Sequence, residues 1–151
     1  MNVRRLDDGS ALYIDAQGLI QSFPAGNGVV HHARRGIIGA PFAKYVIADC
    51  ERELGASGRC ILMVDGYETK MHTTEFRELL TDWFRKHESA TVHMLIRSRM
   101  LEMALNVANM VMGVGRARAY YSVEDWEAAG KKLLPSFRRR EIALPSDSVK
   151  P

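Results

Sequence analysis

Apolar residues in the first third of the chain come in short runs, which predicts strands. The runs cover Ala11–Ile14, residues 19–23 and residues 29–33. Asp-Ala-Gln-Gly separates the first two, and the turn before the third contains Asn27-Gly28, a pair that adopts the positive backbone angles of a tight hairpin. We therefore expect an antiparallel meander in this part of the chain.

After Pro41 the pattern predicts helices that alternate with strands. The first helix ends at Gly55 and Gly58, and its inner face carries Phe42, Val46, Cys50 and Leu54. Strands are then expected at residues 61–64, 91–96 and 117–121. The first of them is almost purely apolar, which is typical of a strand covered on both faces.

Each of these three strands leads into a further helix. The first has apolar residues at helical spacing over residues 76–84, the second covers Arg99–Met112, and the third follows residue 122. All three begin at a hydroxyl side chain that can accept a hydrogen bond from a free backbone N–H, namely Thr73 or Thr74, Ser98, and Ser122.

Consecutive strand-helix units favour neighbouring parallel strands joined by right-handed crossovers. The predicted fold is therefore α/β, with a single mixed sheet of about five or six strands and about four helices. The antiparallel meander extends the sheet beyond the parallel strands. We expect the domain to span residues 1–134, because periodicity is lost after Pro135, and residues 135–151 to form a basic, flexible tail.

The composition is that of one compact domain, with 151 residues of which 46% are hydrophobic. No run approaches the roughly 20 apolar residues of a transmembrane helix. The charged N-terminal residues lack an apolar signal core, so we expect a cytoplasmic protein. Cys50 and Cys60 have neither metal-binding nor redox-motif spacing, which indicates reduced, buried thiols.

The positive charge is concentrated in the last segment. The net charge is +3, and residues 135–151, with four basic and two acidic side chains, carry +2 of it. Arg138, Arg139 and Arg140 form the basic cluster. Because no aromatic residues alternate with these arginines, the cluster is typical of a solvated tail, and we expect no nucleic-acid partner.

The helix Arg99–Met112 holds more apolar residues than one buried face needs. Its polar positions form a single narrow stripe, and the apolar remainder includes Met100, Met103, Val107 and Met110. Methionine side chains adapt to different surfaces. Three interpretations stay open: a central helix with neighbours on several sides, an interface with a second copy or another protein, or the wall of a site for an apolar ligand.

Metal and catalytic sites have little support. The adjacent His31 and His32 point to opposite faces of a strand, and no other histidines have the spacing of paired metal ligands, so we expect neither a metal nor a cofactor. The segment 65–72 is expected to be a loop at the carboxyl end of a strand, where α/β sheets place their sites. Its polar residues, Asp65, Tyr67 and His72 among them, suit an exposed loop equally well.

The segment from residue 59 to residue 134 resembles the STAS and SpoIIAA-like superfamily, which includes a CRAL-TRIO-like branch. The likeness is carried by ILMVDGYETKMHTTEFRELLTDWF, VHMLIRSRMLEMALNVANMVMG and ARAYYSVEDWEAAGKKLL. In its anti-sigma-factor antagonists, a phosphorylated Ser or Thr starts the helix after the middle strand, commonly within Asp-Ser-Ser-Gly. The matching positions are Thr73 and Thr74, although the Asp and the Gly are absent, and a helix-capping role suits Thr73 as well.

The sequence thus predicts a non-enzymatic regulatory domain that binds a partner protein or a second copy. The expected interaction surface comprises Asp65, Tyr67 and His72 with Met100, Met103, Val107 and Met110, and Thr73 or Thr74 is a candidate switch. The alternatives are a carrier of a lipid or other apolar ligand, and a small enzyme with its site at residues 65–72.

Overall fold

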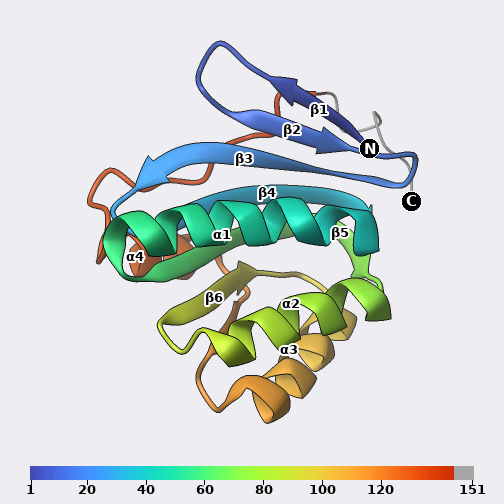
Figure 1. Ribbon diagram of the computed structural model, residues 1–151, viewed down its shortest axis with the longest axis vertical. Coiled ribbons are helices and arrows are strands. Elements are labelled where there is room, and N and C mark those ends of the chain that lie inside the picture. Colours follow the sequence, from blue (N-terminus) through green and yellow to red (C-terminus); the bar gives the residue numbers. More distant parts are fainter. Residues whose placement is uncertain (145–151) are drawn as a thin grey trace.

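The computed structural model describes residues 1–144, which form one seven-stranded sheet with helices on both faces (Figure 1). The strands are β1 (Asn2–Arg5), β2 (Ala11–Ile14), β3 (Gly18–Gly26), β4 (Val29–Ile38), β5 (Cys60–His72), β6 (Ala90–Leu95) and β7 (Ala117–Tyr120). The helices are α1 (Ala43–Ser57), α2 (Thr74–Lys86), α3 (Arg99–Met112) and α4 (Val123–Lys131), with a 3-10 turn, η1 (Ala40–Phe42), before α1.

The strands lie in chain order across the sheet. Neighbours from β1 to β4 pair antiparallel and those from β4 to β7 pair parallel, which confirms the mixed α/β sheet. The described residues form seven strands rather than five or six. The additional strand is β1, whose Asn-Val-Arg-Arg is exposed along its length, so no apolar alternation marks it in the sequence.

The local signals for turns and caps are confirmed. Asn27 and Gly28 have φ angles of 55° and 81° at the β3–β4 hairpin. Thr73 precedes α2, and its Oγ1 accepts a hydrogen bond from the backbone N–H of Phe76 at 3.2 Å. Ser98 and Ser122 accept equivalent bonds at the starts of α3 and α4.

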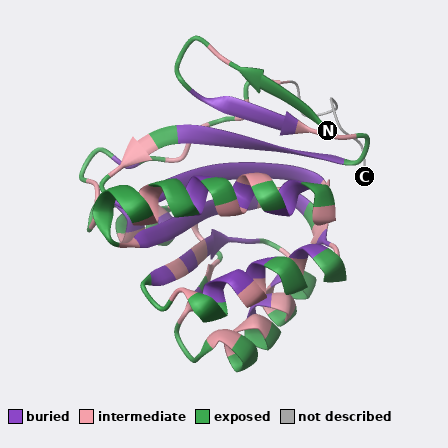
Figure 2. Cartoon of the chain, viewed as in Figure 1, coloured by how far each residue is buried: buried purple, intermediate pink, exposed green. Residues whose placement is uncertain are grey.

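Strand alternation divides the core between the two faces of the sheet. The helix-rich face, covered by α1, α2 and α3, includes Ile20, Val30 and Leu62. The opposite face, which we call the α4 face, includes Val29 and Met63 under α4. Figure 2 shows β4 and most of β5 buried between these layers, whereas β1 is exposed.

The segment that follows α4 belongs to the core, which corrects the predicted boundary at residue 134. Phe137 is only 3% exposed and packs edge to face on Trp126, with 5.1 Å between ring centroids. Gly130 leaves room for it, because a Cβ there would lie 2.2 Å from the Phe137 ring. Farther along, the Ala143 N–H donates to Gln21 on β3. The domain therefore reaches residue 144, and the rest of the predicted tail, residues 145–151, lies outside the described residues.

This arrangement makes Phe137 a core residue. Replacing it with Ala should lower the free energy of unfolding by about 3–5 kcal/mol, because a buried aromatic ring leaves a cavity. Arg138→Ala, a change at the exposed neighbouring position, should stay within about 0.5 kcal/mol of the parent. Urea unfolding followed by tryptophan fluorescence measures both. Equal midpoints for the two variants would contradict the role of Phe137.

Candidate functional site

The predicted loop over residues 65–72 is instead the second half of β5, so the sequence interpretation of this segment was wrong. β5 runs alongside β4 to the pair Ile38 and His72. Two irregularities in the β4–β5 register interrupt simple alternation, and the polar side chains find partners inside the fold. The Asp65 carboxylate lies 2.6 Å from Nε of Arg139, and Glu68 lies 3.3 Å from Arg35.

The strand places the expected site residues on different faces. Asp65 and Tyr67 lie on the α4 face, where the Arg97 and Arg139 guanidinium groups lie 4.6 and 5.0 Å from the Tyr67 ring centroid. His72 lies on the helix-rich face and stacks on Phe76 of α2. Asp65 and His72 are both buried. They therefore do not form the single exposed surface that the sequence predicted.

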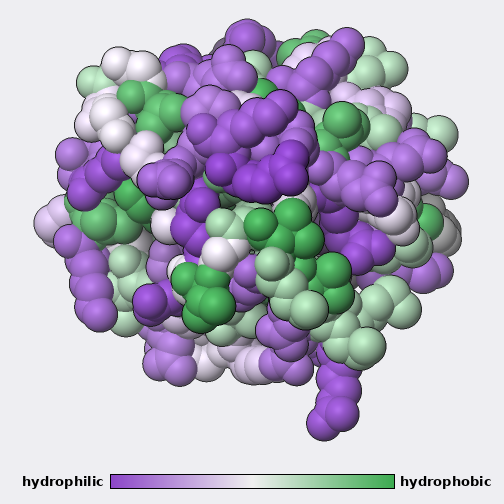
Figure 3. Space-filling model, turned by 60° about the horizontal axis from the view of Figure 1, so that its bottom comes forward, coloured by the Kyte–Doolittle hydropathy of each residue, from purple (hydrophilic) through white to green (hydrophobic). Residues whose placement is uncertain are grey.

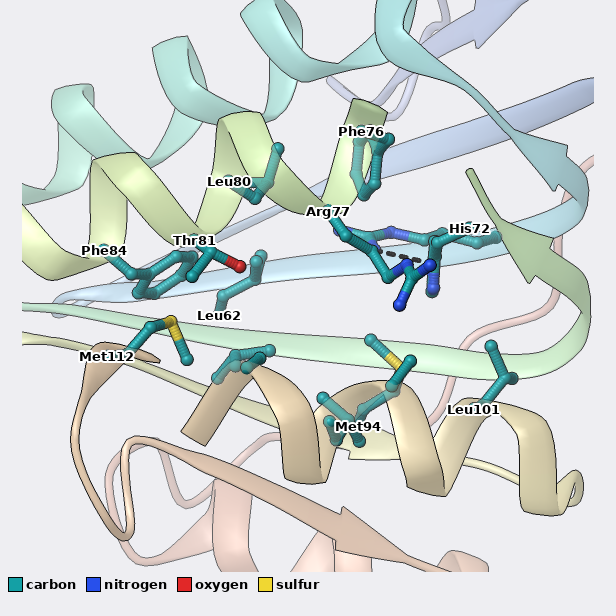
Figure 4. Close-up of a pocket in the computed structure, with 15 residues that line it drawn as sticks. Leu62, His72, Phe76, Arg77, Leu80, Thr81, Phe84, Met94, Leu101 and Met112 are labelled. Carbon is teal, nitrogen blue, oxygen red and sulfur yellow. Dashed lines mark hydrogen bonds between the residues drawn. The ribbon is translucent and has the colours of Figure 1, made fainter. Parts of the chain in front are cut away.

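His72 lines a partly open cavity between α2, α3 and the sheet (Figure 4). We call it the cationic cavity. Its volume is about 70 Å³, and three of its lining residues are basic: Arg34 from β4, His72 from β5 and Arg77 from α2. The other lining residues are apolar except for one hydroxyl: Leu62, Phe76, Leu80, Thr81, Phe84, Val92, Met94, Leu101, Ala104, Leu105, Ala108 and Met112.

A hydrogen bond joins the two strands that contribute to this cavity. Nη1 of Arg34 lies 3.0 Å from Nε2 of His72. Burial, together with the positive charges of Arg34 and Arg77, holds the pKa of His72 well below its usual range. The imidazole is therefore neutral at pH 7, and its Nε2 accepts the hydrogen bond.

Arg34 remains charged although it is only 3% exposed. Burial lowers the pKa of its guanidinium to about 10, still well above neutrality. Its Nε and Nη2 have no hydrogen-bond partner among the described residues, and neither has Nε of Arg77. None of the residues that line the cavity is acidic. The cavity thus holds buried positive charge that no carboxylate of its walls compensates.

A second polar cluster lies beneath α1. Asp49 accepts hydrogen bonds from His32 at 2.8 Å, Ser22 at 2.8 Å and Tyr13 at 3.0 Å. Burial works against ionisation of Asp49, but the bonds from His32 and Ser22 outweigh it and hold the pKa of this carboxyl at about 2. In contrast to Arg34, this buried carboxylate has several hydrogen-bond partners, so the cluster has a structural role in the core.

Neither cluster was predicted, although weak signals were present. Val30, His32 and Arg34 alternate along one strand, so the two basic residues share a face with an apolar one. Asp49 interrupts the apolar face of the first helix beside Val46. The alternation confirms that His31 and His32 point to opposite sides: His31 packs against Phe137 and Trp126 on the α4 face.

The apolar residues of α3 that the sequence singled out are largely exposed. Only Leu101 and Leu105 are buried against the domain. The other side carries Met100, Met103, Val107 and Met110, with exposed fractions of 62%, 66%, 55% and 84%. We call these four residues the α3 stripe. Apolar side chains gather on the face that Figure 3 brings forward, and within residues 1–144 nothing covers the stripe, so α3 is not a central core helix.

The two candidate switch residues differ in their surroundings. Thr73 is half-buried and caps α2. Thr74 is exposed, and its Oγ1 accepts a hydrogen bond from Arg77 at 3.1 Å. It also lies on a groove of about 360 Å³ between α2 and α3, which reaches Val107 of the α3 stripe. Of the two, Thr74 is the one placed where an added charge would act on a surface.

Among residues 1–144, no three His, Cys, Asp or Glu side chains are grouped as a metal site would require. Within the same residues, no helix has both the length and the apolar character needed to cross a membrane. Cys50 and Cys60 are free and buried.

Comparison with known proteins identifies the fold. No family model matches this chain, and no curated protein matches it. A solved structure does match, with probability 1.00 and a TM-score of 0.54: an uncharacterized protein from the DUF3478 family with a SpoIIAA-like fold, from Shewanella loihica PV-4. The two are 15% identical over 80% of this chain and 97% of that one. This likeness confirms the SpoIIAA-like fold and shows the fold alone.

The buried histidines predict a loss of stability in mild acid. Burial lowers the pKa of His31 to about 3, whereas an unfolded histidine takes up a proton near pH 6.5. The unfolded state therefore binds more protons below pH 6.5, and stability should fall as the pH decreases from there. The slope is at most about 1.4 kcal/mol per pH unit for each such histidine. Urea unfolding at pH 7.5, 6 and 5 measures it.

His31→Phe provides the control for this prediction. The ring sits among Phe23, Trp126 and Phe137, and its Nε2 has no partner among the described residues. The variant should match the parent at pH 7.5 and lose less stability by pH 5. Parallel stability curves for variant and parent would show that His31 contributes nothing to the pH dependence.

Proposed function

We propose that this SpoIIAA-like chain is a non-enzymatic regulatory domain that acts by docking a second copy of itself through the α3 stripe. The observation that carries the proposal is the large exposure of four apolar side chains on one helix. Large apolar patches on the surface of a domain mark interaction sites. Two buried free thiols support action in a reducing compartment such as the cytoplasm.

The spacing of the stripe suits a helix as its partner. Met100, Met103, Val107 and Met110 follow one another at intervals of three, four and three residues. This is the spacing of the a and d positions with which helices pack along each other. Leu101 and Leu105 lie on the side that faces the domain, so the stripe can engage a partner without unfolding α3.

The charges around the stripe favour a second copy in antiparallel orientation. Ala104, Asn106 and Val111 flank it and bring no like charges together. The last turn of α3 has no basic residue, and Arg99 is the first residue of the helix. In an antiparallel pair, each Arg99 would lie near the carbonyl end of the other α3, where a positive charge is favourable.

A non-enzymatic role is supported by how the candidate catalytic groups are engaged. Asp65 is in an ion pair with Arg139 on the α4 face, and His72 accepts a hydrogen bond from Arg34 on the other face. An acid-base reaction needs such groups within reach of one substrate atom. Here the sheet separates them.

The docking proposal is tested by charging the stripe. Native mass spectrometry across a concentration series should show a dimer for the parent. Met103→Glu combined with Met110→Glu should weaken it at least about a hundredfold, because an unpaired carboxylate is costly to bury. Leu79→Glu is the matched control, since Leu79 is 48% exposed on α2 and lies outside the stripe. A parent that stays monomeric throughout the series, or a double variant that dimerises as well as the parent, would refute the proposal.

We further propose Thr74 as a switch for this association. Thr74→Glu adds a negative charge to a groove that borders Val107 and whose charged residues, Glu78, Asp82, Arg77 and Arg85, are balanced in the parent. The dimer should weaken several-fold, while the melting temperature stays nearly unchanged because an acidic residue is favourable in the first turn of a helix. Thr74→Val, which removes the hydroxyl without adding charge, should dimerise normally. An unaltered dissociation constant for Thr74→Glu would rule out the switch.

A further inference from the structure

We propose that the cationic cavity is a binding site for a medium-chain fatty acid, with the carboxylate held by Arg34 and Arg77 and the tail lying between α2, α3 and the sheet. The carboxylate-binding end of this site lies apart from the α3 stripe. The cavity is lined by Leu101 and Leu105 of α3, whereas the α3 stripe points away from the domain.

The open side of Arg34 matches a carboxylate. Nη1 is engaged by His72 at 3.0 Å, whereas Nε and Nη2 have no partner among the described residues. Nε and Nη2 form one edge of the guanidinium, and this edge donates two parallel hydrogen bonds to the two oxygens of a carboxylate. The atoms left free are thus the pair that a carboxylate would use.

The protein supplies no anion of its own at this place. Arg34 is buried, and the walls of the cavity carry no acidic side chain. A buried charge without a counter-charge is costly, so buried charges in proteins are normally paired. The Asp49 cluster shows that this fold does satisfy a buried charge elsewhere. An anionic ligand would likewise supply the hydrogen-bond partners and the counter-charge that Arg34 lacks.

The neighbours of Arg34 hold the receiving groups in place. His72 accepts from Nη1, and the Arg34 guanidinium lies 5.4 Å from the Phe76 ring centroid, so the free edge has a defined orientation. Thr74 fixes the far end of Arg77, whose Nε remains without a partner among the described residues. Figure 4 shows His72 and Arg77 together at one end of the cavity, with Phe84 and Met112 toward the other.

The remaining walls select an apolar tail. Beyond the basic residues the lining is aliphatic and aromatic, with Thr81 as its other polar side chain. The cavity volume of about 70 Å³ accommodates only the first few carbons, since a benzene-sized molecule occupies an apolar cavity of about 150 Å³. The flexible Met94 and Met112 can move to lengthen it. Arg77, Thr81, Ala104 and Ala108 line both the cavity and the outer groove, so the two adjoin between α2 and α3, and we place the rest of the tail in the groove.

Isothermal titration calorimetry with decanoate at pH 7.5 tests the proposal. We expect one decanoate per chain, and at least about tenfold weaker binding to Arg34→Met, since a hydrogen bond to a charged group is typically worth a tenfold change or more. Arg138→Met, which removes an exposed guanidinium that lines neither the cavity nor the groove, should bind like the parent. No saturable binding to the parent, or equal binding to Arg34→Met, would overturn the site.

Two further measurements separate a ligand site from a structural arginine. Arg34→Met should melt at or above the temperature of the parent, because the variant no longer buries an uncompensated charge. If it fails to fold, Arg77→Met takes its place in the titration and should also bind decanoate more weakly.

On the parent, 1-decanol and acetate should both bind at least about tenfold more weakly than decanoate. Equal binding of 1-decanol would refute recognition of the carboxylate, and equal binding of acetate would refute recognition of the tail.

Discussion

The parallel pairing of β4 with β5 is the constraint on which the rest of the structure depends. β4 ends the antiparallel meander and begins the parallel half of the sheet, so its register with β5 decides which side chains face which layer. That register places His32, Arg34 and His72 under α1 and α2, and His31 and Asp65 under α4 and the segment after it. A shift of the β4–β5 register by one residue would therefore move each of these buried polar side chains to the opposite face of the sheet.

The sequence predicted the parts of the fold that leave a periodic apolar signal. Six of the seven strands in residues 1–144 and the helix starts at Thr73, Ser98 and Ser122 could be recognised from spacing and cap residues alone. β1 could not, because its exposed side chains show no alternation. The second half of β5 has the polar composition of an exposed loop, because the partners of Asp65 and Glu68, Arg139 and Arg35, are distant in the sequence. Phe137 was missed because one aromatic residue in an aperiodic segment has no pattern.

The candidate sites were predictable to different degrees for the same reason. The surplus of apolar residues on α3 is a property of one helix, so spacing alone indicated that part of it would be left uncovered. The three basic residues of the cationic cavity come from β4, β5 and α2, and Arg34 is far from the other two along the chain. The defining feature of the cavity is a guanidinium edge without an acidic neighbour, which depends on the three-dimensional surroundings of Arg34. No count of residues along the chain contains that information.

The segment from residue 135 to residue 144 has a consequence for biosynthesis. It covers Leu12 and Leu19 with Ile142 and Leu144, and it seals Trp126 with Phe137. A ribosome makes these residues after the seven described strands, so part of one apolar face stays open to water until they emerge. Such transient faces are where nascent chains aggregate or recruit chaperones. In this domain, the nascent chain can complete the layer on the α4 face only after residues 135–144 have left the ribosomal exit tunnel.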